Sequence, residues 1–275
     1  MSRPFALLKT APVSARFGLV VVAGYGIVAV LAPTLAPYGE TQIVGVEFAD
    51  WSAQHWLGTD DLGRDVLSRL LYGARNTIGI ATLTTLIAAV VGGVAGLVAG
   101  SLRGWVDQVL GRLVDVLMAV PSLILTLLML AIFGTSIFSM IGIIALIEST
   151  RIFRLARALA LGIGRFDYVT TARLRGEGLM WIVFREILPN AGAPLIAEFG
   201  LRFCFVFLFI ATLSFLGLGV QPPAADWGSM VRDNATLLSY GQMSPLIPAG
   251  AIALLTMAVN LIVDWLVHQS SGLQE

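Results

Sequence analysis

Long apolar segments alternate with shorter polar ones along most of the chain. A transmembrane helix needs about 20 mostly apolar residues, and six segments meet or approach this length. They are Phe17–Pro33, Thr77–Gly100, Leu113–Phe133, Ser136–Thr150, Pro194–Gly219 and Ser244–Val267. The pattern predicts an all-α membrane protein with six transmembrane helices, preceded by a short N-terminal segment, residues 1–16.

Lysine and arginine are spread unevenly between these apolar segments. With the N-terminus inside, twelve of them fall on the inner side and four on the outer side. The inner set is Arg3, Lys9, Arg16, Arg103, Arg112, Arg151, Arg154, Arg157, Arg165, Arg173, Arg175 and Arg185. The outer set is Arg64, Arg69, Arg75 and Arg232. Because cytoplasmic loops carry the excess of positive charge, we predict two cytoplasmic termini, an outer loop at residues 34–76 and a cytoplasmic loop at residues 151–190.

Composition agrees with a chain that lies in lipid. Hydrophobic residues make up 57% of the sequence and charged residues 12%, about half the charged share of a soluble domain. The 17 basic and 17 acidic residues cancel, so nothing indicates a nucleic-acid partner. The single cysteine, Cys204, allows no disulfide within the chain, and two distant histidines give no indication of a His-rich metal site.

The only lysine is Lys9. A P-loop needs a lysine directly after a glycine-rich turn to reach the phosphates of a nucleotide, and Lys9 stands in LLKTAP, without such glycines. We therefore expect no cofactor on this chain. Any ATP-driven work would need ATP and Mg²⁺ on another subunit.

Two polar stretches combine charge with helical spacing. In the outer loop, Thr59 is suited to an N-cap, and Asp60 with Arg64 and Asp65 with Arg69 form acid-before-base pairs at i,i+4. This pattern predicts an amphipathic helix at the outer membrane surface, whose apolar face is Leu62, Val66, Leu67, Leu70 and Leu71.

The second polar stretch, YVTTARLRGEGLMWIVFREILPN, runs from Tyr168 to Asn190 inside the cytoplasmic loop. Val169–Leu174 has helical spacing, Ala172 and Gly176 share a face, and Pro189 is expected to stop the helix before the fifth span. A short helix with small residues on one face could dock in a cleft of another protein. The alternative is a helix that lies at the membrane surface.

A family resemblance covers nearly the whole chain, from about Phe17 to Asp264. The strings HWLGTDDLGRDVLSRLLYGAR, RGWVDQVLGRLVDVLMAVP, LPNAGAPL, LSFLGLGVQPPAADWGSM and VNLIVDW follow one another in order. Together they resemble the C-type permeases of dipeptide, oligopeptide and nickel ABC importers. The resemblance implies a type I (MetI-like) permease fold over residues 17–275, with a cytoplasmic coupling helix and no catalysis on this chain.

The Tyr168–Asn190 stretch resembles the family's coupling loop, the EAA motif. The motif's glutamate and first alanine fall on Thr170 and Thr171, which is a departure, whereas Ala172 and Gly176 match. The ending Ile187-Leu188-Pro189 matches as well. The resemblance implies that the ATPase-coupling residues are Thr170, Thr171, Ala172, Leu174, Gly176, Leu188 and Pro189.

The family also implies partners and a place in the cell. These are a second, homologous permease, two ABC ATPase subunits and an extracytoplasmic substrate-binding protein, assembled in the bacterial cytoplasmic (inner) membrane. The function implied is import of di- or oligopeptides. Nickel complexes or other small solutes are the alternative within the family. A self-sufficient secondary transporter is the alternative outside it, but the coupling-type loop argues against that, and no catalytic constellation in the spans indicates an intramembrane enzyme.

Several further residues carry candidate roles. Glu198 and Arg202 lie four apart inside the fifth span, so they either line the translocation pathway or form a structural pair that faces the partner permease. In the loop after that span, Asp226, Trp227 and Arg232 are candidate contacts for the binding protein, and Trp227 could also anchor the membrane interface. Span two carries four glycines that allow close helix packing, within this bundle or against a partner: Gly92, Gly93, Gly96 and Gly100.

Overall fold

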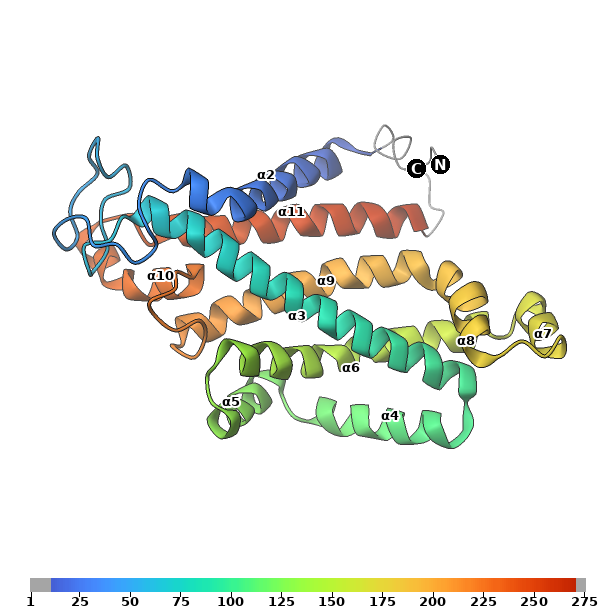
Figure 1. Ribbon diagram of the computed structural model, residues 1–275. Helices are drawn as coiled ribbons and strands as arrows, with labels where there is room; N and C mark the ends of the chain where they lie inside the picture. The colour runs from blue at the N-terminus through green and yellow to red at the C-terminus, as the bar shows by residue number, and fades with distance from the viewer. Residues whose placement is uncertain (1–10, 271–275) are drawn as a thin grey trace. The chain divides into compact units, whose positions relative to one another are not determined.

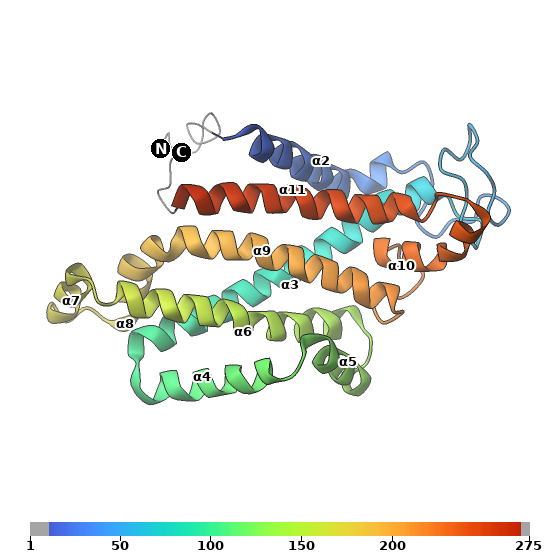
Figure 2. The ribbon, with the colours of Figure 1, turned by 180° about the vertical axis from the view of Figure 1, so that it is seen from behind.

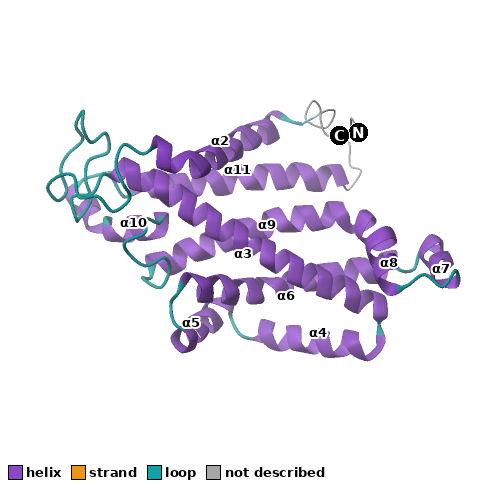
Figure 3. Cartoon of the chain, in the orientation of Figure 1, coloured by secondary structure: helices purple, strands orange, loops and turns teal. Residues whose placement is uncertain are grey.

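The computed structural model describes residues 11–270, which consist of helices and loops (Figures 1 and 3). Lys9 and most of the predicted N-terminal segment lie outside this range. The helices are α2 (Val13–Leu35), α3 (Val66–Leu102), α4 (Gly104–Ala119), α5 (Ser122–Phe133), α6 (Ile137–Ile163), α7 (Asp167–Leu174), α8 (Leu179–Ile182), the π-helix η1 (Val183–Ile187), α9 (Leu188–Phe215), α10 (Trp227–Asp233), the 3₁₀ helix η2 (Ala235–Tyr240) and α11 (Leu246–Ser270).

Not all six predicted spans become simple transmembrane helices. Within residues 11–270, four helices are long and apolar enough to cross a membrane, and a bent pair, α4 with α5, would make a fifth. The fourth predicted span lies in α6, where charges from Glu148 onward interrupt the apolar run. The all-helical fold is confirmed, whereas the count of six spans stays a prediction.

The third predicted span is broken rather than continuous. α4 ends at Ala119, Pro121 precedes α5, and the two helices meet at an angle of 92°. A proline lacks the N–H that would continue the helical hydrogen bonds, and its ring clashes with the preceding turn. Pro121 therefore marks the end of one helix and the start of another.

The chain divides into two compact units. The first contains the described residues up to Thr82, Thr135–Ile137 and Phe203–Trp265. Inside it α2 and α11 run side by side (Figures 1 and 2), and the Tyr25 hydroxyl donates to the Ala251 carbonyl at 3.2 Å. The helices are close because Gly18 lacks a side chain: a Cβ there would stand 2.5 Å from the carbonyl oxygen of Ala258.

The amphipathic helix predicted from Thr59 onward forms only from Val66, as the first turns of α3. Residues 36–65 are an irregular loop, and helix α3 starts only at Val66. The Thr59 hydroxyl donates to the Val46 carbonyl at 2.6 Å instead of capping a helix. Asp65 takes the capping role, because its carboxylate accepts the backbone N–H of Ser68 at 2.8 Å.

The second unit contains Leu83–Gly134, Phe138–Arg202 and the described residues from Leu266 onward. Here the small residues of α3 pack on α6. A Cβ on Gly96 would stand 2.5 Å from the carbonyl oxygen of Phe153, and one on Gly100 would stand 2.6 Å from that of Arg157. The glycines therefore bring the two backbones into contact. This packing lies within the chain, as one of the two alternatives predicted.

Candidate functional site

The predicted coupling loop forms a short helix, α7, that has two different faces. Val169 and Ala172 point inward and are 0% exposed. They join an apolar cluster, here called the α7 core, that also takes residues from α3, α6, η1 and α9. Its buried members are Leu97, Ala156, Ala160, Ile163, Val169, Ala172, Ile182, Val183, Ile187 and Ala191. The helix is thus anchored on its own unit.

The opposite face of α7 is open. Thr170 and Thr171 are exposed, and Leu174 is 84% exposed. Ala172, one of the predicted ATPase-coupling residues, packs into the α7 core. Its buried methyl group anchors the helix, and a part in coupling stays a prediction. The face available to a partner is therefore formed by the two threonines and the leucine.

Gly176 ends α7 in a left-handed conformation, with φ of +82°. The Gly176 N–H donates to the Arg173 carbonyl at 3.0 Å, and the Glu177 N–H donates to the Ala172 carbonyl at 3.2 Å. These two bonds make a Schellman motif, in which glycine is favoured because it has no Cβ. The glycine therefore has a structural reason of its own, separate from any close contact with a partner.

The return from α7 contains a feature that the sequence did not reveal. Pro189 was expected to stop the helix, but one apolar helix runs from Leu179 to Phe215. A π-helix, η1, precedes the proline, and the Leu188 N–H donates to the Val183 carbonyl, five residues back. The wider π turn changes the hydrogen-bond pattern just where a proline lacks its N–H, so the chain continues without a break. Leu188 is half-buried and Pro189 is exposed.

The arginines beside α7 are engaged within the chain. Arg173 donates to the Ser101 carbonyl, in the last turn of α3, at 3.3 Å. The Arg175 guanidinium lies 5.8 Å from the ring centre of Trp181 and 3.9 Å from Glu177. Arg173 therefore uses part of its guanidinium inside the second unit. Its contact fixes α7 to α3.

A buried ion cluster joins the two helices that flank the predicted coupling loop. Arg202 of α9 lies 2.8 Å from Glu198, as the sequence spacing predicted, and 3.2 Å from Glu148 of α6. Exposed fractions of the three side chains are 11%, 16% and 11%. No spacing pattern indicates the contact with Glu148, which lies 54 positions from Arg202. The geometry shows an ion cluster between two helices of this chain. The two predicted roles, lining the pathway or facing the partner permease, stay predictions.

A second ion pair fixes α4 to α6. Arg157 donates from Nη2 to Asp107 Oδ2 at 2.7 Å, and its Nε also contacts the same carboxylate. Arg151 and Arg154 precede Arg157 at spacings of three along α6. Arg151 lies 3.8 Å from Glu148, and Arg154 lies 3.9 Å from Asp115. Of the three arginines, Arg157 therefore makes the shortest contacts between α6 and α4.

Comparison with known proteins places this arrangement in a family. Residues 92–271 match the model of the binding-protein-dependent transport system inner membrane component. The chain belongs to this family. This permease is 33% identical to the dipeptide transport system permease protein DppC of Alkalihalophilus pseudofirmus, over 90% of this chain and 82% of that protein. It is 36% identical to the di/tripeptide transport system permease protein DppC of Pseudomonas aeruginosa, over 86% and 81%.

A solved structure shares the fold of the permease. It is a chain of the crystal structure of an amino acid ABC transporter with histidines, with a TM-score of 0.53 and 20% sequence identity. The match covers 72% of this chain and 92% of that one. The fold class predicted from sequence, that of an ABC importer permease, is confirmed.

The permease keeps Asp226 and Trp227 in its interior. They are 0% and 2% exposed. Asp226 caps α10 by accepting the Ser229 N–H at 2.9 Å and also accepts the Thr77 hydroxyl at 2.9 Å, while burial raises the pKa of its carboxyl. Trp227 donates to the Leu70 carbonyl at 2.9 Å. Neither side chain can touch a binding protein or anchor a membrane interface here, because both are enclosed.

Arg232 is the one predicted contact residue of this loop that remains partly open. Its side chain is 36% exposed and lies 2.8 Å from Asp233. It also donates to the Ser214 carbonyl at 3.3 Å. A role in binding a partner stays a prediction for Arg232 alone.

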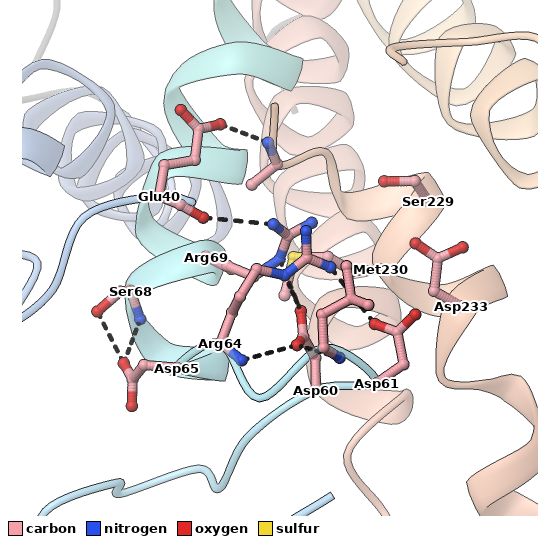
Figure 4. A network of polar contacts seen from close by, with 12 residues as sticks. Glu40, Asp60, Asp61, Arg64, Asp65, Ser68, Arg69, Ser229, Met230 and Asp233 are labelled. Atoms are coloured by element: carbon pink, nitrogen blue, oxygen red, sulfur yellow. Dashed lines mark hydrogen bonds and ion pairs between the residues drawn. The ribbon is translucent and has the colours of Figure 1, made fainter. Parts of the chain in front are cut away.

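Buried charges organise the 36–65 loop (Figure 4). Asp60 lies 2.7 Å from Arg64 and 3.2 Å from Arg69, with all three side chains at most 7% exposed. Asp65 pairs with His55 at 3.1 Å rather than with Arg69. Asp61 stands at the margin, and burial, with the neighbouring Asp60 carboxylate, raises the pKa of its carboxyl. Among residues 11–270, no group of three His, Cys, Asp or Glu side chains could hold a metal ion.

Proposed function

We propose that this permease imports di- or oligopeptides in an ATP-driven complex. Support comes from the relatives, whose names specify dipeptide and di/tripeptide transport systems. The complex would contain a second permease, two ABC ATPase subunits that carry ATP and Mg²⁺, and an extracytoplasmic binding protein. The chain itself would bind no cofactor, and both of its termini would lie in the cytoplasm, as the distribution of basic residues favours.

The exposed face of α7 is the proposed docking site for one ATPase. The observation that carries this proposal is the contrast between the faces of one short helix. Ala172 is fully buried in the α7 core, whereas Leu174 is 84% exposed next to Thr170 and Thr171. An exposed leucine on an anchored helix suits an apolar cleft on a partner. Gly176, Leu188 and Pro189 shape and support the docking helix.

Movement of the docked ATPase would pass through α7 into the rest of the second unit. The α7 core ties the helix to α3, α6 and α9, and the Glu148–Arg202 contact ties α6 to α9. A push on α7 therefore moves helices rather than a loose loop. Glu198 and Arg202 are mostly buried in this conformation. They can line the pathway only in a conformation in which the helices have moved and exposed their side chains.

Leu174→Asp tests the docking proposal. The variant should lose co-purification with the ATPase subunits in mild detergent, because a carboxylate in an apolar cleft is costly. The matched control is Ile43→Asp, which changes another exposed aliphatic side chain, 70% exposed in the 36–65 loop. Normal ATPase recovery with Leu174→Asp, in well-folded material, would remove α7 as the docking site.

A further inference from the structure

A small apolar hollow lies directly behind the predicted coupling loop, inside the second unit. Its volume is about 140 Å³. Every lining side chain is apolar, and the walls come from α3, α6, α8, η1 and α9. The lining residues are Ala89, Gly93, Val94, Leu97, Val98, Ile152, Met180, Val183, Phe184, Leu188, Leu195 and Phe199.

The hollow exists because one glycine faces open space while its neighbour is packed. A Cβ on Gly93 would meet no atom within 4 Å. A Cβ on Gly92, one position earlier, would collide with the carbonyl oxygen of Ser149. Gly92 therefore serves the contact between α3 and α6, whereas Gly93 leaves room that no other side chain fills.

The far wall of the hollow is the segment that links α7 to α9. Met180 comes from α8, Val183 and Phe184 come from η1, and Leu188 begins α9. Val183 also belongs to the α7 core. Anything that fills the hollow would therefore press on the same residues that hold the coupling helix.

The chemistry of the lining selects the occupant. Water needs two to four polar partners, and an engineered apolar cavity of about 150 Å³ stays dry yet takes up small hydrophobic molecules. The walls of α3 and α9 belong to helices apolar enough to cross a membrane, so the surrounding apolar molecules are lipid chains. Phe184 and Val94 are 49% and 44% exposed at this site, and Arg185, which follows Phe184, is exposed and able to pair with a phosphate.

We propose that this hollow binds the end of a phospholipid acyl chain, and that the bound chain stiffens the link between α7 and α9. Binding alone is a property of the second unit. The regulatory half of the inference rests on the proposed coupling function. Because the filled hollow favours the arrangement in which η1 lies against α3, lipid occupancy shifts the population of coupling-competent transporters.

The test uses the intact transporter complex in nanodiscs that contain a phospholipid with a photoreactive diazirine near the end of one acyl chain. After irradiation, labelled peptides are mapped by mass spectrometry. We expect label on residues 180–184 and 93–98. Gly93→Leu should abolish this label, and Gly93→Ala should reduce it, because each adds apolar atoms where no atom stands within 4 Å.

The matched control is Gly79→Leu, in the same helix, where an added Cβ also meets nothing within 4 Å. This variant should keep the label at the hollow. Absence of label in the unchanged permease, label that persists in Gly93→Leu, or a crosslink to another protein at these residues would each overturn the binding site.

Transport-coupled ATP hydrolysis, measured in the same nanodiscs, tests the regulatory half. Gly93→Leu should alter the response of hydrolysis to lipid chain length, whereas Gly79→Leu should not. Unchanged lipid dependence in a variant that has lost the label would overturn the regulatory role. Failure of the docking proposal can be told apart from failure of the lipid proposal. Docking is measured by ATPase recovery with Leu174→Asp, which needs no lipid label.

Discussion

The 36–65 loop and the predicted coupling loop are both rich in charged and polar residues, yet they use them in opposite ways. In the 36–65 loop, Asp60, Arg64 and Asp65 are at most 6% exposed and satisfy one another or the backbone. In the coupling loop, apolar residues and one bond from Arg173 hold α7, and Thr170 and Thr171 face outward. A polar segment therefore indicates a partner surface only where the opposite, apolar face of the same helix is buried in the protein.

The largest effect should come from removing a charge of the 36–65 loop. Asp60→Asn leaves Arg64 and Arg69 without their shared carboxylate, and breaking a buried ion pair costs about 3–5 kcal/mol. Thermal unfolding in detergent should show this loss of stability. Asp50→Asn, an exposed acid of the same loop, serves as the control, and an equal loss in both variants would contradict the burial argument.

The cluster in the second unit should show strong coupling between its members. A double-mutant cycle with Glu148→Gln and Arg202→Gln should give an interaction energy of about 1–3 kcal/mol. The reason is that each single variant already removes the 3.2 Å contact between the two buried charges, although Arg202 keeps its pair with Glu198. Unfolding of the two single variants and the double variant provides the measurement. Purely additive losses would show that the two charges do not interact.

Two substitutions on α7 compare its faces directly. Ala172→Leu overfills the α7 core and should cost about 1–3 kcal/mol of stability. Thr171→Leu adds a similar side chain on the exposed face and should change stability by less than about 0.5 kcal/mol. Proteolysis or unfolding measurements can rank the two. Equal tolerance of leucine at both positions would mean that α7 is not anchored as described.

The smallest effect concerns Gly176. Gly176→Ala should destabilise the end of α7 by about 1 kcal/mol because alanine disfavours a left-handed conformation, whereas Gly176→Asn should cost less. Hydrogen exchange of the amides at 172–177 would report the difference. If both variants fray the helix equally, then the positive φ is not the reason for the glycine.

Sequence patterns predicted the parts of this protein that depend on local spacing. The apolar segments became helices, Val169–Leu174 lies within α7, and the i,i+4 spacing of Glu198 and Arg202 gave a close ion pair. Family motifs in the right order identified the permease.

Patterns failed where a residue's partner is distant in the chain. Glu148 joins Arg202 across 54 positions, and Asp226 is buried against Thr77 of another helix, so neither spacing nor motif could reveal these contacts. Pro189 was expected to end a helix, but the helix continues past it after a π turn. The sequence carries no clear signal for such a turn. The two faces of α7 also depended on the tertiary core.

Site-directed crosslinking would test the docking face most directly. Cysteine would replace Leu174 or Val169 of this chain in the assembled transporter. The one native cysteine of the chain, Cys204, is buried. A short reagent with one thiol-reactive end and one photoreactive end would then probe for the ATPase. We predict a crosslink from position 174 and none from position 169. A crosslink from position 169, or none from 174 in an active complex, would contradict the proposed docking of α7.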